Sequence, residues 1–231
     1  MSFTLSDAEI EAVLLSLRIS LIAVLVALPF AIAVAWLLSR HRFPGRSVLD
    51  AIVHMPLVLP PVVMGYLLLI TFGARAPLGR WLLETFDIRL VFSWTGAALA
   101  AAIVTFPFQV RAIRLAMEAI DPGLTQAAET LGANAWDRFI SIILPLAAPG
   151  ILAGAITAFA ASLGEFGAII TFVSNIPGET RTLPLAIYTA IQTPGGEEAA
   201  ARLAIMAILL AFAGLFLSEV AARKLRAIVG R

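Results

Sequence analysis

The sequence predicts an all-α polytopic membrane protein, and three observations lead to this prediction. The chain of 231 residues is 61% hydrophobic and only 13% charged. Its apolar runs come near the length of about 20 residues with which a helix crosses a hydrocarbon layer of about 30 Å. It contains no cysteine, which excludes disulfides, thiol nucleophiles and cysteine metal sites. We therefore expect a single transmembrane domain over residues 1–231.

Five apolar segments are the expected transmembrane helices. They cover residues 19–38, 49–72, 95–110, 147–172 and 203–222. The fourth is long for one crossing and contains the sequence SLGEFGA, so it is either a span followed by a short re-entrant helix or a pair of spans, six in all. Prolines interrupt the first three segments, and each removes a backbone donor and bends its helix. They are Pro29, Pro56, Pro60, Pro61 and Pro107.

Basic residues set the expected orientation, because short loops rich in Arg and Lys stay cytoplasmic. With the N-terminus outside, the inner segments hold Arg40, Arg42, Arg46, Arg111, Arg114, Arg138, Arg223, Lys224, Arg226 and Arg231. The outer loops then hold only Arg75, Arg80, Arg89 and Arg181. Arg18 and Arg202 fall at the outer ends of spans, where a long side chain can extend to the interface. We expect the N-terminus outside and the C-terminus inside.

Residues for chemistry are scarce, so we expect no enzyme activity in this chain. A P-loop needs Lys followed by Ser or Thr, whereas the only lysine, Lys224, precedes Leu225. The only two histidines, His41 and His54, do not have the one-turn spacing of a zinc protease. Ser162 lacks the first glycine of a nucleophile elbow. A net charge of +1 with dispersed basic residues gives no indication of a nucleic-acid partner.

One polar stretch, QAAETLGANAWDRFISIILP at residues 126–145, predicts a helix-turn-helix on the cytoplasmic side. Residues 124–131 favour a helix, Gly132 suits a left-handed stop, and Asn134 with Asp137 resembles a capping pair that starts a second helix.

In that second helix Trp136, Phe139, Ile140 and Ile143 recur at helical spacing, and Pro145 is expected to end it where the next span begins. The alternative is an interfacial helix lying on the inner leaflet.

The same stretch resembles the conserved cytoplasmic loop of ABC importer permeases, whose pattern is Glu-Ala-Ala, three residues, Gly, nine residues and Ile-x-Leu-Pro. Gln126 stands where the pattern has Glu. The resemblance implies a fold like that of type I importer permeases, with a hairpin at about residues 122–145 that sits in a cleft of an ATP-binding subunit. The residues it assigns to this contact are Gln126, Ala127, Ala128, Glu129, Gly132, Trp136, Phe139, Ile142, Leu144 and Pro145.

Three further stretches resemble the permeases of molybdate importers: RFPGR, MPLVLPPVVMGYLLL and SLGEFGAIITFVSNIPGETRTLPLAIYTAIQTPGGE. Sulfate permeases carry a similar SLGEFGA element. The resemblance implies a homodimer in a bacterial inner membrane that passes molybdate, and with it tungstate. Its partners would be an ATP-binding subunit dimer, which holds the ATP and Mg, and a periplasmic molybdate-binding protein; this chain would hold no cofactor.

Two alternatives stay open. One is the permease of a sulfate or related oxyanion importer. The other is a secondary transporter without ATP, which would favour an internal repeat and carboxylates or histidines near the bilayer centre.

Glu165 is the acid that lies farthest from the ends of an apolar segment. It either accepts hydrogen bonds at a break flanked by Gly164 and Gly167 or serves a gate. Because no Arg or Lys lies near the bilayer midplane, we expect small polar groups to give a passing anion weak contacts. The candidates are Thr71, Thr105, Ser162 and Gly164. The alternative is that these hydroxyls only bond their own helix backbones.

The outer loop at residues 174–200 is acidic, with Arg181 against Glu179, Glu197 and Glu198. We expect it to dock basic residues of a binding protein. The alternative for Glu197 and Glu198 is that they complement the dipole at the start of the last helix.

Overall fold

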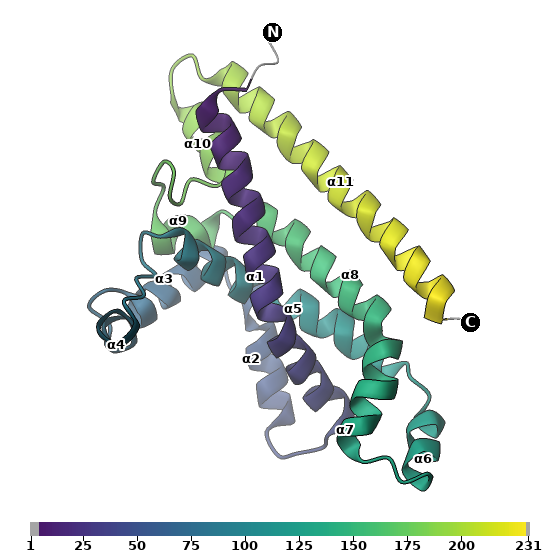
Figure 1. Ribbon diagram of the computed structural model, residues 1–231. Coiled ribbons are helices and arrows are strands. Elements are labelled where there is room, and N and C mark those ends of the chain that lie inside the picture. The colour runs from purple at the N-terminus through teal and green to yellow at the C-terminus, as the bar shows by residue number, and fades with distance from the viewer. Residues whose placement is uncertain (1–4, 230–231) are drawn as a thin grey trace.

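The computed structural model describes residues 5–229, and every regular element in that range is helical (Figure 1). The elements are α1 (Asp7–Arg40), α2 (Arg46–Val58), α3 (Pro61–Phe72), α4 (Pro77–Phe86), α5 (Trp94–Glu118), α6 (Pro122–Thr130), α7 (Ala135–Arg138), the π-helical turn η1 (Phe139–Ile143), α8 (Leu144–Leu163), α9 (Gly167–Val173), α10 (Leu183–Gln192) and α11 (Glu197–Val229). Several side chains of α11 and residue 231 lie outside this description, among them the basic residues Arg223, Lys224, Arg226 and Arg231.

Within the described residues, three helices are long and apolar enough to cross a membrane. They are α1, α5 and the continuous helix Ala135–Leu163. The α2–α3 pair adds a fourth if it is taken as one broken span.

The second apolar segment is bent much more sharply than a single span, because α2 and α3 meet at 116°. Pro60 and Pro61 explain the break: neither can donate a backbone hydrogen bond, and Pro61 begins α3 at a position where no donor is needed. The predicted interruption of residues 49–72 by prolines is confirmed.

The fourth apolar segment also divides, as SLGEFGA predicted. Helix α8 ends at Leu163 and α9 begins at Gly167. With 7 residues, α9 is about 10 Å long, too short to cross a bilayer by itself.

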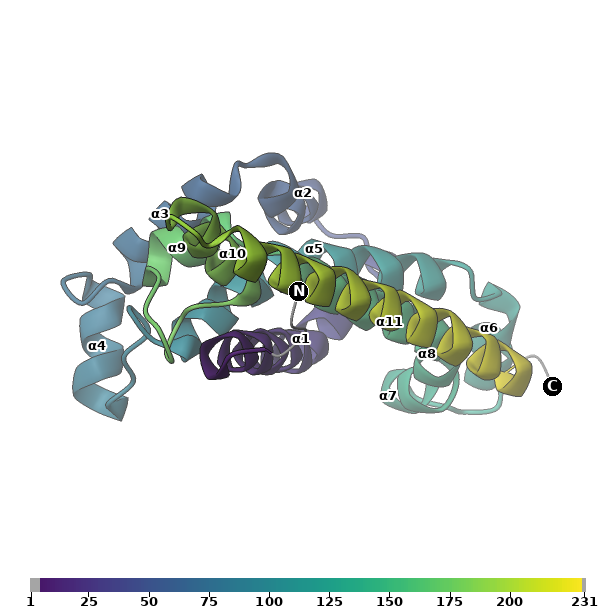
Figure 2. The same ribbon diagram turned by 90° about the horizontal axis from the view of Figure 1, so that it is seen from above.

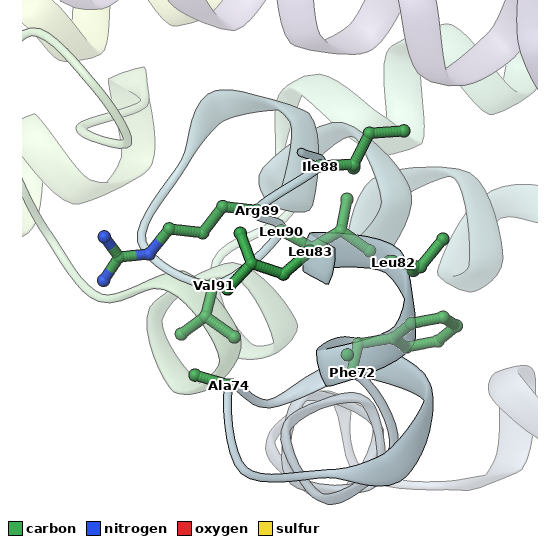
Figure 3. Close-up of a pocket in the computed structure, with 9 residues that line it drawn as sticks. Phe72, Ala74, Leu82, Leu83, Ile88, Arg89, Leu90 and Val91 are labelled. Carbon is green, nitrogen blue, oxygen red and sulfur yellow. The ribbon is translucent and has the colours of Figure 1, made fainter. Parts of the chain in front are cut away.

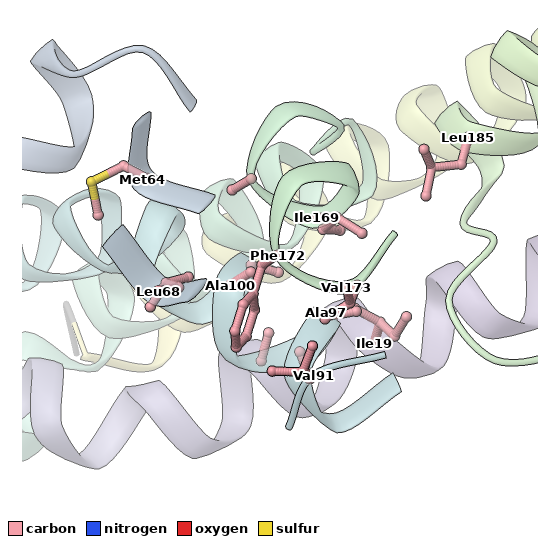
Figure 4. Packing of buried hydrophobic residues seen from close by; sticks show 14 of the residues in the cluster. Ile19, Met64, Leu68, Val91, Ala97, Ala100, Ile169, Phe172, Val173 and Leu185 are labelled. Atoms are coloured by element: carbon pink, nitrogen blue, oxygen red, sulfur yellow. The ribbon is translucent and has the colours of Figure 1, made fainter. Parts of the chain in front are cut away.

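Two apolar cores hold these helices together. The first joins α1, α3, α5 and α9 around Phe172, Ile169 and Leu68, which Figure 4 shows at close range. The second lies at the opposite end of α1 and α5 and includes Leu38, Ile113 and Phe139. Alanines of α5 contribute to the first core and alanines of α1 to the second, and small side chains let the two backbones approach closely.

Small residues of α8 pack against α5 within the chain. A Cβ on Gly150 would lie 2.2 Å from the Cβ of Ala116, and one on Gly154 would lie 3.1 Å from that of Ala112. These glycines therefore place α8 directly against α5.

Helix α1 is longer than a bilayer requires. Its 34 residues span about 51 Å. Arg18, whose guanidinium lies 3.9 Å from the centre of the Trp94 ring, is about 33 Å along the helix from Arg40, close to the hydrocarbon thickness. Residues 7–17 therefore extend beyond this interval.

Those first turns of α1 pack with α10 and residues 197–210 of α11 into a structure that we call the α10 cap. Its apolar centre contains Ala12, Val13, Leu183 and Leu203. In Figure 1 the cap lies at one end of the molecule, and α6 and α7 lie at the other.

Candidate coupling and transport sites

The stretch at residues 122–145 forms a helical hairpin, and Gly132 makes its turn. Gly132 has φ +88°, in the left-handed region. Its N–H donates to the carbonyl of Glu129, and the N–H of Ala133 donates to that of Ala128, both at a distance of 3.0 Å. This is the Schellman arrangement that glycine makes possible at a helix end. The predicted left-handed stop is confirmed.

The second limb of the hairpin begins with the predicted capping pair. The Asn134 Oδ1 accepts from the N–H groups of Trp136 and Asp137, at 2.9 and 3.0 Å. The Asp137 carboxylate in turn accepts from the Asn134 N–H at 3.3 Å. This reciprocal capping box starts α7.

Pro145 does not end this helix, which corrects the sequence prediction. The helix runs without interruption from Ala135 to Leu163. One π-helical turn, η1, precedes the proline, and its last bond joins the Leu144 N–H to the Phe139 carbonyl five residues earlier. A proline ring clashes with the carbonyl four residues before it, and the wider π turn gives the ring room. The second limb of the hairpin and α8 thus form one continuous helix.

The expected apolar stripe divides between the interior and the surface. Phe139 and Ile143 are buried in the second core. Trp136 is 62% exposed and Leu131, at the turn, 88% exposed. The hairpin tip therefore presents apolar side chains that no residue of the described part of the chain covers.

The other residues that the resemblance assigns to the contact with an ATP-binding subunit lie on the exposed side of the hairpin or on the helix that continues into α8. Gln126, Ala127 and Glu129 are exposed, Ala128 and Leu144 half-buried, and Ile142 half-buried beside exposed Pro145. An ion pair of 2.5 Å between Glu129 and Arg138 joins the two limbs. The hairpin is thus braced by its own residues.

At the α8–α9 break, Glu165 caps the short helix. Its Oε1 accepts from the Ala168 N–H at 2.8 Å, and the side chain is buried. Ser162, one turn earlier and also buried, donates to the Ser20 Oγ of α1 at 2.9 Å. Gly164 between them is exposed. Glu165 thus accepts a hydrogen bond at the break, and the break brings three of the five pathway candidates together.

The two threonines lie elsewhere. Thr105 is fully buried and donates to the Ala101 carbonyl of its own helix at 2.7 Å. Thr71 is exposed, yet its hydroxyl donates to the Leu67 carbonyl at 2.7 Å. In this conformation both hydroxyls satisfy their own helices, as the alternative reading held, because a threonine oxygen readily reaches the carbonyl four residues back.

The four residues predicted to dock a binding protein lie at the α10 cap or beside it. Glu197 and Glu198 occupy the first turn of α11 and are exposed, as is Glu179. Arg181 donates from Nε to the Asn175 Oδ1 at 2.9 Å and so folds back onto its own loop.

Further exposed acids, Asp7 and Glu11 on α1, add to the negative charge of the cap. They line a hollow of about 370 Å³ together with Arg18 and Gly178. Sequence reasoning missed them because only the fold brings the first helix beside the loop at residues 174–182.

A second hollow lies between α4 and the strand-like segment before α5, and Figure 3 shows its lining. Leu82, Leu83, Ile88 and Val91 surround a cavity of about 10 Å³, which holds no more than about one water molecule. The side chains around this hollow hold α4 against residues 88–91, and the hollow has no room for a ligand.

Comparisons with known proteins agree with this architecture. The family of binding-protein-dependent transport system inner membrane components matches residues 27–227. The molybdenum transport system permease protein ModB of Escherichia coli K12 is 60% identical over 98% of this chain and 99% of that protein. The sulfate transport system permease protein CysT of the same organism is 38% identical over 79% of this chain and 67% of that protein.

Among solved structures, a chain of a bacterial alginate ABC transporter, crystallised with a pentasaccharide-bound periplasmic protein, superimposes with a TM-score of 0.76. The likeness covers 95% of this chain and 80% of that chain at 20% identity, so it concerns the fold alone. The family match and the 60% identity lead to one conclusion: this chain belongs to the binding-protein-dependent transport system inner membrane components.

Proposed function

We propose that this chain is the permease subunit of an ATP-driven importer of molybdate, with tungstate as a chemically similar passenger. The observation that carries the proposal is the 60% identity, over nearly the whole of both chains, to a molybdenum transport permease. The identity to the sulfate permease is 38%. Import of sulfate is the second candidate, because it would use the same architecture.

The α6–α7 hairpin is the contact with the ATP-binding subunit. Two copies of this chain form one path and sit on an ATPase dimer, whose clefts receive the exposed apolar tips with Leu131 and Trp136. Closure of that dimer on ATP moves the hairpins together and tilts the spans, and hydrolysis reverses the movement. ATP and Mg belong to the ATPase, and this chain neither hydrolyses ATP nor holds a cofactor.

The chain crosses the bacterial inner membrane five times as a single domain over residues 1–231, with its N-terminus outside. The crossings are α1, the broken pair α2–α3, α5, α8 and α11. Support for the orientation comes from the end of the molecule that carries the hairpin. The loop between α1 and α2 lies at that end too (Figure 1). Arg40 ends α1, Arg46 begins α2 and Arg138 ends α7, while Arg114 pairs with Asp50 of α2. The α10 cap then faces the periplasmic binding protein.

The test is ATP hydrolysis by this permease reconstituted in lipid with its candidate ATP-binding subunit. Binding protein preloaded with molybdate, with sulfate or with nothing is added outside. We expect stimulation by the molybdate form. Stimulation by the sulfate form alone would keep the mechanism and change the substrate, and failure to bind any ATPase subunit would contradict the importer.

A further inference from the structure

Helix α1 is fastened at both of its ends to the parts of the chain that face the two partners. At the hairpin end, Arg40 donates from Nη2 to the Met117 carbonyl of α5 at a distance of 3.0 Å. Arg40 is in the last turn of α1, and Met117 is in the last turn of α5. The two helix C-termini are side by side, and each carries partial negative charge. The guanidinium between them offsets their repulsion.

The α6–α7 hairpin begins four residues after Glu118, so this contact holds its first limb. Its second limb is held by contacts between aromatic rings. The Trp36 ring of α1 lies 5.1 Å from that of Phe139, which in turn lies 5.6 Å from the exposed Trp136 ring. A displacement of Trp136 therefore reaches α1 through two aromatic contacts.

A hollow of about 250 Å³ separates α1 from the hairpin between these two attachments. Arg40 and His41 line it from α1, and Thr125, Glu129 and Arg138 line it from the hairpin. Because the space between is not filled by side chains, the hairpin meets α1 at defined points instead of along a continuous packed surface.

At the other end, polar contacts bind the first turns of α1 to the other two parts of the α10 cap, α10 and the start of α11. Glu9 is 5% exposed and accepts from the Arg202 Nη2 of α11 at 2.9 Å. The Ser16 Oγ accepts from the N–H of Leu183, the first residue of α10, at 2.6 Å. A buried carboxylate loses its water and needs such a partner, so the pair fixes α1 to α11.

Between its two ends α1 is a single helix, and it also crosses the α8–α9 break, where Ser20 accepts from Ser162. Pro29 is the one residue inside it that cannot donate a backbone bond. A helix of this kind transmits a shift along its axis from one end to the other, since the remaining backbone hydrogen bonds resist extension.

We propose that α1 is the element that couples the hairpin to the α10 cap, with Arg40 and Arg202 as its positioning residues. A binding protein that docks on the cap would shift α1 through Glu9 and Ser16, and Trp36 with Arg40 would pass the shift to the hairpin. The inference rests on the proposed function, because it takes the hairpin and the cap as the two docking sites.

The experiment uses the complete complex of permease, ATP-binding subunit and molybdate-loaded binding protein in lipid. Arg40→Gln and Arg202→Gln are each compared with the unaltered chain for bound ATPase subunit, basal hydrolysis and stimulation by binding protein. We expect the ATPase subunit to stay bound and the stimulation to fall about 5-fold or more in each variant. Because both residues serve one link, the double variant should lose no more stimulation than the single variant that is more strongly affected.

Conservative and distant changes separate positioning from general damage. Arg40→Lys and Arg202→Lys keep a charged donor and should recover much of the stimulation. Arg80→Gln, the same change on exposed α4, should leave it unaltered. If Arg40→Gln impairs folding, Trp36→Leu tests the same end through the ring contact alone.

Full stimulation in Arg202→Gln, or losses that add up in the double variant, would overturn the proposal. No stimulation of the unaltered complex would instead contradict the proposed function.

Discussion

At Gly132 the backbone has φ +88°, and no atom lies within 4 Å of the position that a Cβ would take. A larger side chain therefore meets no neighbour, and the only obstacle is its own backbone conformation. For a β-branched residue in the left-handed region that obstacle amounts to about 1 kcal/mol or more.

We expect Gly132→Val to insert in the membrane and dimerise but to lose transport, because the turn can no longer present the tip of the hairpin. Molybdate uptake into vesicles, compared at equal amounts of inserted protein, measures the loss. Gly132→Asn is the matched control, since asparagine tolerates the left-handed region and should keep most of the uptake. Normal uptake in the valine variant would show that the hairpin does not transmit the movement.

Single residues were predictable where their partners are near in sequence. The left-handed turn at Gly132 and the capping box of Asn134 and Asp137 depend on bonds that reach at most five residues, and both are as predicted. The burial of Thr105 could not be predicted, because it depends on how α5 packs against its neighbours, which no local pattern contains. The pair of Glu9 and Arg202 joins residues 193 positions apart and had no sequence signal.

The short helix α9 depends on one carboxylate. Glu165 accepts from the Ala168 N–H, one of the donors that a helix start leaves without a partner inside the helix. Glu165→Gln keeps an oxygen acceptor at this place, whereas Glu165→Ala removes it, so the two variants separate the hydrogen bond from the charge.

We expect Glu165→Ala to destabilise the protein by about 0.5–2 kcal/mol, the usual loss for a helix cap, and Glu165→Gln to lose much less. Thermal unfolding of the purified protein in detergent measures both. Uptake that is abolished in Glu165→Gln, with unfolding unchanged, would show that the charge serves a gate and not a cap.

The helices could be predicted from the sequence where the length and apolarity of a segment determine its structure. All five apolar segments are helical, because a membrane leaves the backbone no other partner for its hydrogen bonds. The helices extend past the apolar residues: α5, expected at residues 95–110, runs from Trp94 to Glu118. The angle of 116° between α2 and α3 depends on packing against α9 and could not be read from the prolines alone.

On the scale of the whole molecule, negative charge gathers at the end opposite the hairpin. The exposed acids there are Asp7, Glu11, Glu179, Glu197 and Glu198. The nearby bases Arg18, Arg181 and Arg202 contact Trp94, Asn175 and Glu9 within the chain. Figure 2 shows that α11 leads from this acidic end along the length of α8. A partner with a basic surface is the natural complement of such a face.

We expect charge reversal at Glu197 and Glu198 to reduce the stimulation of ATP hydrolysis by loaded binding protein while basal hydrolysis persists. If the two acids only complement the helix dipole, the reversal lowers stability, by about 0.3–1 kcal/mol for each residue, and leaves the stimulation unaltered. Hydrolysis with and without binding protein, together with thermal unfolding, distinguishes these outcomes. Glu84→Lys on exposed α4, away from the α10 cap, is the control.

The continuous helix from Ala135 to Leu163 has a consequence for efficiency. A loop between hairpin and span would let the tip swing while the span stayed still, and ATP could then be consumed without transport. With a helix in its place, any rotation of Ala135 about the axis turns the residues before Gly164 as well. The ratio between a movement of the hairpin and the movement at the α8–α9 break is thus set by backbone geometry, which few single substitutions can alter.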